Sequence, residues 1–138
     1  MAHAPFTCHV PYYEAGTLQV TGFIDGKSVI INTATTPGKP YKIIVKADYS
    51  GKPFKAGYKD AVFVYAYIVD SKGTIIPDAT NSVRFSVNGD ANIVGDKINK
   101  AESGIAPALI MGGAKAGNII IKANADGLMS GELSVLLK

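Results

Sequence analysis

The stretch Ala61-Val-Phe-Val-Tyr-Ala-Tyr-Ile-Val-Asp70 decides the fold, because it runs through nine apolar or aromatic residues without a glycine, a proline or a charge before Asp70. In a β-strand, successive side chains point to opposite faces. The two faces would carry Val62, Val64 and Ile68 opposite Phe63, Tyr65 and Tyr67. A strand that is apolar on both faces is expected at the centre of a sheet with its outer face covered, and a neighbouring domain could provide that cover.

Further strand signals flank this stretch between Pro40 and Lys138, separated by turn-rich segments. In the strand around Phe85, apolar residues alternate with Arg84 and Ser86, which predicts one buried face and one solvent-exposed face. No segment shows a helical period capped at both ends. Seven short strands in about a hundred residues predict an all-β fold, a β-sandwich. The expected strands are Tyr41–Asp48, Ala61–Asp70, Ser82–Asn88, Asn92–Val94, Ile105–Met111, Asn118–Ala125 and Gly131–Leu137.

A β-hairpin is predicted ahead of the sandwich, because Asp25-Gly26 separates two β-rich runs, Thr17–Ile24 and Lys27–Thr35. Two strands alone are marginally stable in water, so the hairpin must dock on something. Pro37-Gly38-Lys39-Pro40 then interrupts the strand pattern and is the best candidate for a domain boundary. We therefore expect a partial domain at residues 1–38 and a sandwich at residues 39–138.

The hairpin also suggests how the chain could assemble. The sequence after Met1 looks like the middle of a domain, so we expect the chain to be cut from a longer one. A hairpin without its parent domain has unpaired strand edges, and such edges favour association. Dimerisation through Thr17–Thr35 is therefore expected.

Composition excludes several classes of function. The 138 residues carry a net charge of +3 from scattered lysines and one arginine, without the basic stripe that nucleic-acid binders show. No apolar run approaches the roughly 20 residues of a membrane span, and no signal peptide is evident. Neither a nucleic-acid partner nor a membrane is expected.

Two segments resemble ligand-binding loops but do not have the key residues at the required positions. Gly22–Ser28 is similar to a phosphate-binding loop, but its glycines are one residue too close and a hairpin follows them. Asn88, Asp90 and Asn92 alternate like the start of a calcium loop, yet the required glycine and glutamate are missing. An EF-hand is excluded, whereas a weaker calcium site at Asp90 and Asp96 stays open. Solvated loop acids are the commoner interpretation, and we predict no metal site.

No set of residues suits catalysis. A glycosidase needs two facing carboxyl groups, whereas the glutamates lie in separate segments and Asp70 and Asp78 flank a turn. The two histidines and Cys8 lack partners at triad or zinc spacing. We therefore predict no catalytic and no cofactor-binding residue. The glutamates are Glu14, Glu102 and Glu132, and the histidines are His3 and His9.

The seven tyrosines are the remaining candidates for binding. A tyrosine ring has an apolar face for stacking on a sugar and a hydroxyl that forms hydrogen bonds. Their scatter and the lack of tryptophan favour packing or a protein interface over a sugar platform. Tyr41, Tyr65 and Tyr67 are the candidate interface or sugar-stacking residues.

An ordered set of segments, from Val10–Leu18 and Asp25–Lys27 through Ala61–Asp70 to Gly127–Leu128, resembles the C-terminal region of β-galactosidase-like enzymes of glycoside hydrolase family 2. Residues 10–40 are similar to the end of one immunoglobulin-like domain, and most of the remaining chain is similar to the next domain. Lys97–Met111 departs from the family, whose members usually have a longer polar and aromatic segment there. The matching segments are Val10–Leu18, Asp25–Lys27, Gly38–Pro40, Ala61–Asp70, Gly73–Ala79, Val83–Gly89, Ile93–Asp96, Ala116–Gly117, Ile119–Ala125 and Gly127–Leu128.

The resemblance implies an immunoglobulin-like sandwich preceded by the last strands of another such domain. The family's catalytic glutamates belong to a (β/α)₈ barrel that this chain does not resemble, so no catalytic residue carries over. The chain would then be a non-catalytic accessory piece of a larger, exported bacterial glycan hydrolase, packing against the other domains of its own polypeptide. Two alternatives stay open, a carbohydrate-binding module with a glycan partner and an adhesin-type immunoglobulin-like module.

Overall fold

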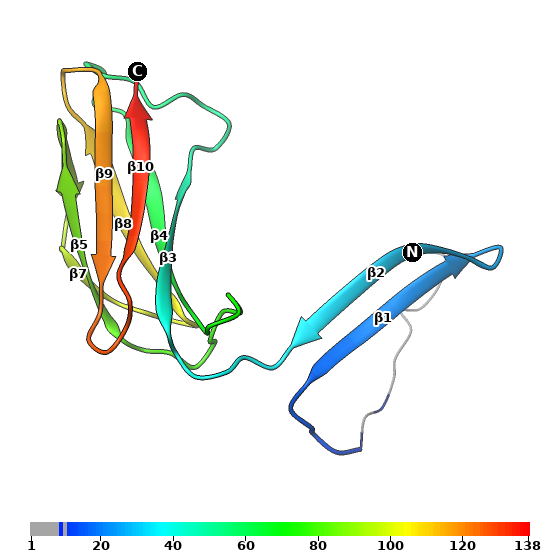
Figure 1. Ribbon diagram of the computed structural model, residues 1–138. Coiled ribbons are helices and arrows are strands. Elements are labelled where there is room, and N and C mark those ends of the chain that lie inside the picture. The colour runs from blue at the N-terminus through cyan, green and yellow to red at the C-terminus, as the bar shows by residue number, and fades with distance from the viewer. Residues whose placement is uncertain (1–8, 10) are drawn as a thin grey trace. The chain divides into compact units, whose positions relative to one another are not determined.

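The computed structural model describes residue 9 and residues 11–138, which form ten β-strands (Figure 1). The all-β class predicted from the sequence is confirmed. Within the described part of the chain, no helix is long and apolar enough to cross a membrane. The chain divides into two compact units, Met1–Thr36 and Pro37–Lys138.

The first unit is an antiparallel hairpin of β1 (Thr17–Ile24) and β2 (Lys27–Thr35), with the predicted bounds. Asp25 and Gly26 form the turn with φ angles of 49° and 73°. Positive φ at both central residues is the requirement of a type I′ turn, which glycine meets freely and aspartate tolerates. The register shifts between Gly22 and Phe23, so the hairpin contains a bulge close to its turn.

The second unit is a sandwich of two four-stranded antiparallel sheets, ordered β3-β4-β8-β6 and β10-β9-β5-β7 (Figure 1). The first order corresponds to strands A, B, E and D of an immunoglobulin constant-type sandwich, and β10-β9-β5 to strands G, F and C. As predicted, the strand at residues 61–69 is central. The strands are β3 (Lys42–Asp48), β4 (Ala61–Val69), β5 (Ser82–Asn88), β6 (Ala91–Val94), β7 (Ile98–Lys100), β8 (Ile105–Gly112), β9 (Gly117–Asn124) and β10 (Gly131–Leu137).

The core lies between the inner faces of the two sheets. Alternate residues of most of these strands point inward, as the alternation around Phe85 predicted. Full burial of one such aliphatic or aromatic side chain contributes about 1.5–3 kcal/mol, so this layer dominates the stability of the unit. Its largest fully buried side chains include Phe85, Ile68, Ile110, Ile119, Ile121 and Leu137.

One strand of the sandwich was not predicted. Eight strands are present where about seven were expected, and the additional one is β7. It pairs with β5 through Ser82↔Lys100, Val83↔Asn99 and Arg84↔Ile98. The Asn99 side-chain amide donates hydrogen bonds to the carbonyls of Asp96 and Pro107. The segment that departs from the family pattern is therefore an ordered part of the sandwich.

Candidate functional site

A row of three aromatic rings lies on the outer face of the β3-β4-β8-β6 sheet. Phe63, Tyr65 and Tyr67 alternate along β4 with the buried residues of the core. The Phe63 and Tyr65 rings stack with centroids 6.1 Å apart, and the Tyr65 and Tyr67 centroids are 6.4 Å apart. Phe63 is 50% exposed, so the row is open to contact at one end.

The neighbouring strands extend this row into an apolar outer face. Ile44 of β3 and Ile105 of β8 lie opposite Tyr67, and Leu109 of β8 lies opposite Phe63. Lys46 of β3 places its Nζ 5.5 Å from the centroid of the Tyr67 ring, a cation–π contact. We call this surface the apolar outer face. It consists of Ile44, Phe63, Tyr65, Tyr67, Ile105, Pro107, Leu109 and Met111.

The outer face of the second sheet is mostly polar by contrast, although Leu136 of β10 and Ile98 of β7 are exposed on it. Lys122 and Glu132 lie opposite each other on β9 and β10 and form an exposed ion pair with an N–O distance of 3.0 Å. Ser86 of β5 lies on the other side of Lys122. An antiparallel sheet commonly packs one face on the core and leaves the other in water. The polar face fits that rule, whereas the apolar outer face departs from it.

The structure brings together two of the three tyrosines that the sequence singled out. Tyr65 and Tyr67 are neighbours in the aromatic row. Tyr41 precedes β3 and joins the sheet through its backbone, since its N–H donates to Val69 O at 2.9 Å and its carbonyl accepts from Met129 N–H. Phe63 was not predicted as a site residue, although strand alternation places it on the same face as Tyr65.

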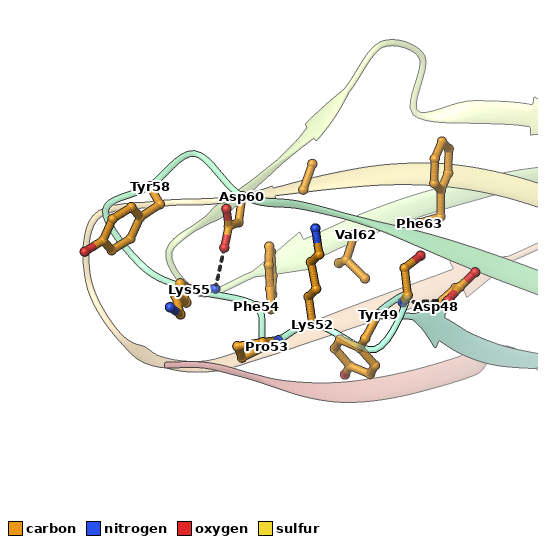
Figure 2. A pocket seen from close by; sticks show the side chains of 12 residues that line it. Asp48, Tyr49, Lys52, Pro53, Phe54, Lys55, Tyr58, Asp60, Val62 and Phe63 are labelled. Atoms are coloured by element: carbon orange, nitrogen blue, oxygen red, sulfur yellow. Dashed lines mark hydrogen bonds between the residues drawn. The ribbon is translucent and has the colours of Figure 1, made fainter.

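A hollow of about 390 Å³ lies at one end of the sandwich, around the loop between β3 and β4 (Figure 2). Figure 2 shows Tyr58 at one end of the hollow and Phe63 at the other, with Phe54 and Val62 between them. Phe54 and Val62 are 4% and 3% exposed, so they form a buried apolar floor. The full lining is Asp48, Tyr49, Ser50, Lys52, Pro53, Phe54, Lys55, Tyr58, Asp60, Ala61, Val62 and Phe63.

Backbone hydrogen bonds hold this loop in place from both sides. The carbonyl of Lys138 accepts from Ala56 N–H at 2.7 Å, and the N–H of Lys138 donates to Phe54 O at 2.9 Å. On the other side, Gly57 N–H donates to Gly113 O and Gly112 N–H to Asp60 O, both at 2.9 Å. The hollow is therefore formed by a loop that is tied to β8 and to the end of β10.

Two carboxylates of the hollow shape the loop through hydrogen bonds from the backbone. Asp48 Oδ1 accepts from Ser50 N–H at 2.8 Å, and Asp60 Oδ2 accepts from Lys55 N–H at 3.1 Å (Figure 2). Ser50 and Lys59 have φ angles of 47° and 53°. Left-handed conformations of residues other than glycine cost energy and are found disproportionately at functional sites.

The acidic residues tested for metal binding and catalysis are dispersed. Across residue 9 and residues 11–138, no three His, Cys, Asp or Glu side chains gather where they could hold a metal ion. Asp90, a member of the calcium pattern, accepts a hydrogen bond from Lys115 N–H at 2.6 Å. His9 is exposed, whereas His3 and Cys8 lie outside the described residues.

Asp70 is the one buried acidic residue among those the structure describes. Its carboxylate accepts backbone hydrogen bonds from Gly38 at 2.9 Å, Thr74 at 2.8 Å and Lys72 at 2.9 Å. The bond from Gly38 is the largest cause of a lowered pKa, followed by that from Thr74, while burial acts in the opposite direction. Asp70 organises the β4–β5 connection, as expected for an aspartate in a turn.

The fold and these surfaces define a β-sandwich module of the immunoglobulin type. Residues 43–134 match the family model for glycoside hydrolase family 2 C-terminal domain 5, and the chain belongs to this family. It is 30% identical to a β-galactosidase from Thermoanaerobacter pseudethanolicus and 32% identical to one from Bacteroides ovatus, over 91% and 89% of the chain. A glycosyl hydrolase family 2 structure from Bacteroides cellulosilyticus matches 91% of the chain with 27% identity and a TM-score of 0.81.

The chain is much shorter than these relatives. It spans 18% and 16% of the two curated β-galactosidases and 18% of the solved structure. The resemblance stated from the sequence is thus confirmed, as the C-terminal region of family 2 glycoside hydrolases.

Proposed function

We propose that the chain is a non-catalytic accessory domain of a β-galactosidase-like glycoside hydrolase, and that it packs against the rest of its polypeptide through the apolar outer face. The contrast between the two sheets carries this proposal, because one outer face is mostly polar while the other presents the aromatic row of Phe63, Tyr65 and Tyr67. The apolar outer face is half-buried apart from Phe63 and Pro107, which are exposed. A contiguous apolar patch on an outer face is typical of a surface that another protein covers. Aromatic residues and methionine are enriched in such interfaces.

The rest of the same polypeptide is the occupant that fits this face. Each of the two curated relatives is more than five times as long as its matched region, so most of its chain lies outside that region. We further propose that residues 1–38 are the last strands of a preceding immunoglobulin-like domain and that residues 39–138 form the next one. The division between Thr36 and Pro37 supports this organisation.

A matched pair of substitutions tests the docking face. Tyr65→Asp adds a charge to the apolar outer face, and Ser86→Asp adds the same charge to the polar face. Both are introduced into the 138-residue chain and into the full polypeptide that its gene encodes. We expect Tyr65→Asp to lower the Tm several degrees more in the full polypeptide than in the short chain, because only there is the face covered. An equal effect in both contexts would contradict the docking proposal.

The gene and the activity provide independent checks. A catalytic barrel encoded upstream supports the accessory role, whereas tandem immunoglobulin-like repeats would support an adhesin module instead. The short chain should release no sugar from an aryl β-galactoside. Hydrolysis by the purified chain at an enzymatic rate would overturn the non-catalytic assignment.

A further inference from the structure

We propose that the hollow between Tyr58 and Phe63 binds a neutral saccharide of one or two rings. This inference goes beyond the docking role, because the hollow lies at the end of the sandwich and meets the apolar outer face only at Phe63. Its volume of about 390 Å³ is in the lower part of the range of about 300–1,000 Å³ that small-molecule sites occupy. The size therefore suits a small ligand rather than a protein segment.

The walls combine apolar surfaces with groups that form hydrogen bonds. Phe54 and Val62 supply the apolar floor, and Tyr58 is 74% exposed at one end. Lys55 Nζ lies 5.8 Å from the centroid of the Tyr58 ring, a contact that favours one ring orientation. A sugar ring has an apolar face of C–H groups and a polar edge of hydroxyls, so an aromatic face next to polar side chains suits it.

The charges of the hollow favour a neutral ligand. Two lysines, Lys52 and Lys55, are balanced by two carboxylates, Asp48 and Asp60. Each carboxylate uses one oxygen to accept a backbone N–H, and its second oxygen is left to accept a hydroxyl. A phosphate or another anion would meet two negative charges, whereas a purely apolar ligand would bury four charged groups. The hydroxyl groups of a polyol can donate hydrogen bonds to the carboxylates and accept them from the lysines, which satisfies the polar groups of both kinds.

The hollow is also preformed. The backbone hydrogen bonds that the loop forms with Lys138, Gly112 and Gly113 fix it before any ligand arrives. A ligand that binds a fixed site loses less free energy to ordering of the protein, so modest contacts give measurable affinity. The positive φ angles of Ser50 and Lys59 belong to this same loop.

A nuclear magnetic resonance titration of the 138-residue chain tests the inference. The probes are cellobiose, xylobiose and β-1,4-galactobiose, each raised to about 10 mM, which exceeds the Kd of a millimolar complex. Glycerol at the same concentration of hydroxyl groups is the control for solvent effects. We expect at least one disaccharide to shift backbone resonances of residues 48–63 in a saturable way, with glycerol producing no such pattern.

Two tyrosine substitutions supply the matched comparison. Tyr58→Ala removes an exposed ring of the hollow without touching the core, and Tyr12→Ala removes an exposed ring of the first unit that does not line the hollow. Loss of one stacking ring should raise the Kd about tenfold for Tyr58→Ala, whereas Tyr12→Ala should leave it unchanged. The proposal is overturned if no disaccharide gives a saturable shift, if the shifts centre on Tyr65 and Tyr67, or if Tyr58→Ala binds like the unaltered chain.

Discussion

The carboxylate of Asp70, at the end of β4, accepts a hydrogen bond of 2.9 Å from the backbone N–H of Gly38, which lies 32 positions earlier in the chain. The same carboxylate also accepts from Lys72 and Thr74 in the turn that follows β4. One side chain therefore joins the segment that enters the sandwich to the turn that leaves its central strand. Because the group is only 3% exposed, water cannot replace these bonds easily.

Asp70→Asn should lower the thermal stability of the sandwich. The amide retains one acceptor oxygen and places an NH₂ group where a second acceptor is needed, so at least one backbone N–H loses its partner. We expect the Tm to fall by several degrees in thermal unfolding followed by circular dichroism. Asp126→Asn, in the exposed β9–β10 turn, is the control and should leave the Tm unchanged. Equal Tm values for the two variants would contradict this role of Asp70.

The lowered pKa of Asp70 predicts a specific dependence of stability on pH. The folded state binds the proton of this group less readily than the unfolded state does. The contribution of Asp70 to the free energy of unfolding is therefore fully present above the ordinary aspartate pKa. It is lost as the pH falls toward the lower pKa of the folded state. Urea unfolding between about pH 5 and pH 3 should show a smaller loss of unfolding free energy in Asp70→Asn than in the unaltered chain. Parallel pH curves would count against the prediction.

Gly104→Ala should destabilise the sandwich far more than Gly127→Ala. Both glycines have left-handed backbones, with φ angles of 75° and 76°. A methyl group at residue 104 would collide with the backbone carbonyl of Ile76, whereas one at residue 127 would meet open space. We expect a loss of about 1 kcal/mol for Gly127→Ala, from strain alone, and of about 3 kcal/mol or more for Gly104→Ala. Denaturant unfolding measures both, and similar losses would refute the collision.

The hairpin should mediate self-association of the short chain. The register of β1 and β2 places Leu18, Val20 and Ile30 on the same face, and all three are at least 60% exposed. Exposed apolar surface and free strand edges favour contact with a second copy. Light scattering should give a larger mass for the unaltered chain than for Leu18→Lys. Gln19→Lys, on the opposite face, is the control, and a monomeric mass for all three chains would exclude this association.

The strands that could be predicted from the sequence are those with a local signal, either a turn motif beside them or an alternation of apolar residues within them. The hairpin bounds were correct because Asp25-Gly26 specifies a turn by its backbone preferences alone. The aromatic row followed from the alternation at residues 61–69, since strand geometry fixes which residues share a face. β7 was missed because its three residues have no apolar alternation, and its place depends on pairing with β5. Such tertiary pairing leaves no local signal.

The hollow escaped prediction for a related reason. Its lining combines the ends of two strands with a loop of glycine, proline, lysine and tyrosine residues, a composition that indicates only irregular structure. The contacts that shape it come from β8 and from Lys138, far away in the sequence. Only the folded chain brings Tyr58 and Phe63 to opposite ends of one cavity.

The hydrogen bonds between Lys138 and the loop at residues 54–56 have a practical consequence. They hold residue 138 directly beside the hollow, although its side chain is not part of the lining. An environment-sensitive fluorophore attached to the Lys138 side chain would stand next to any bound molecule without replacing a residue that contacts it. A fluorophore at this position would therefore report optically whether the hollow holds a ligand.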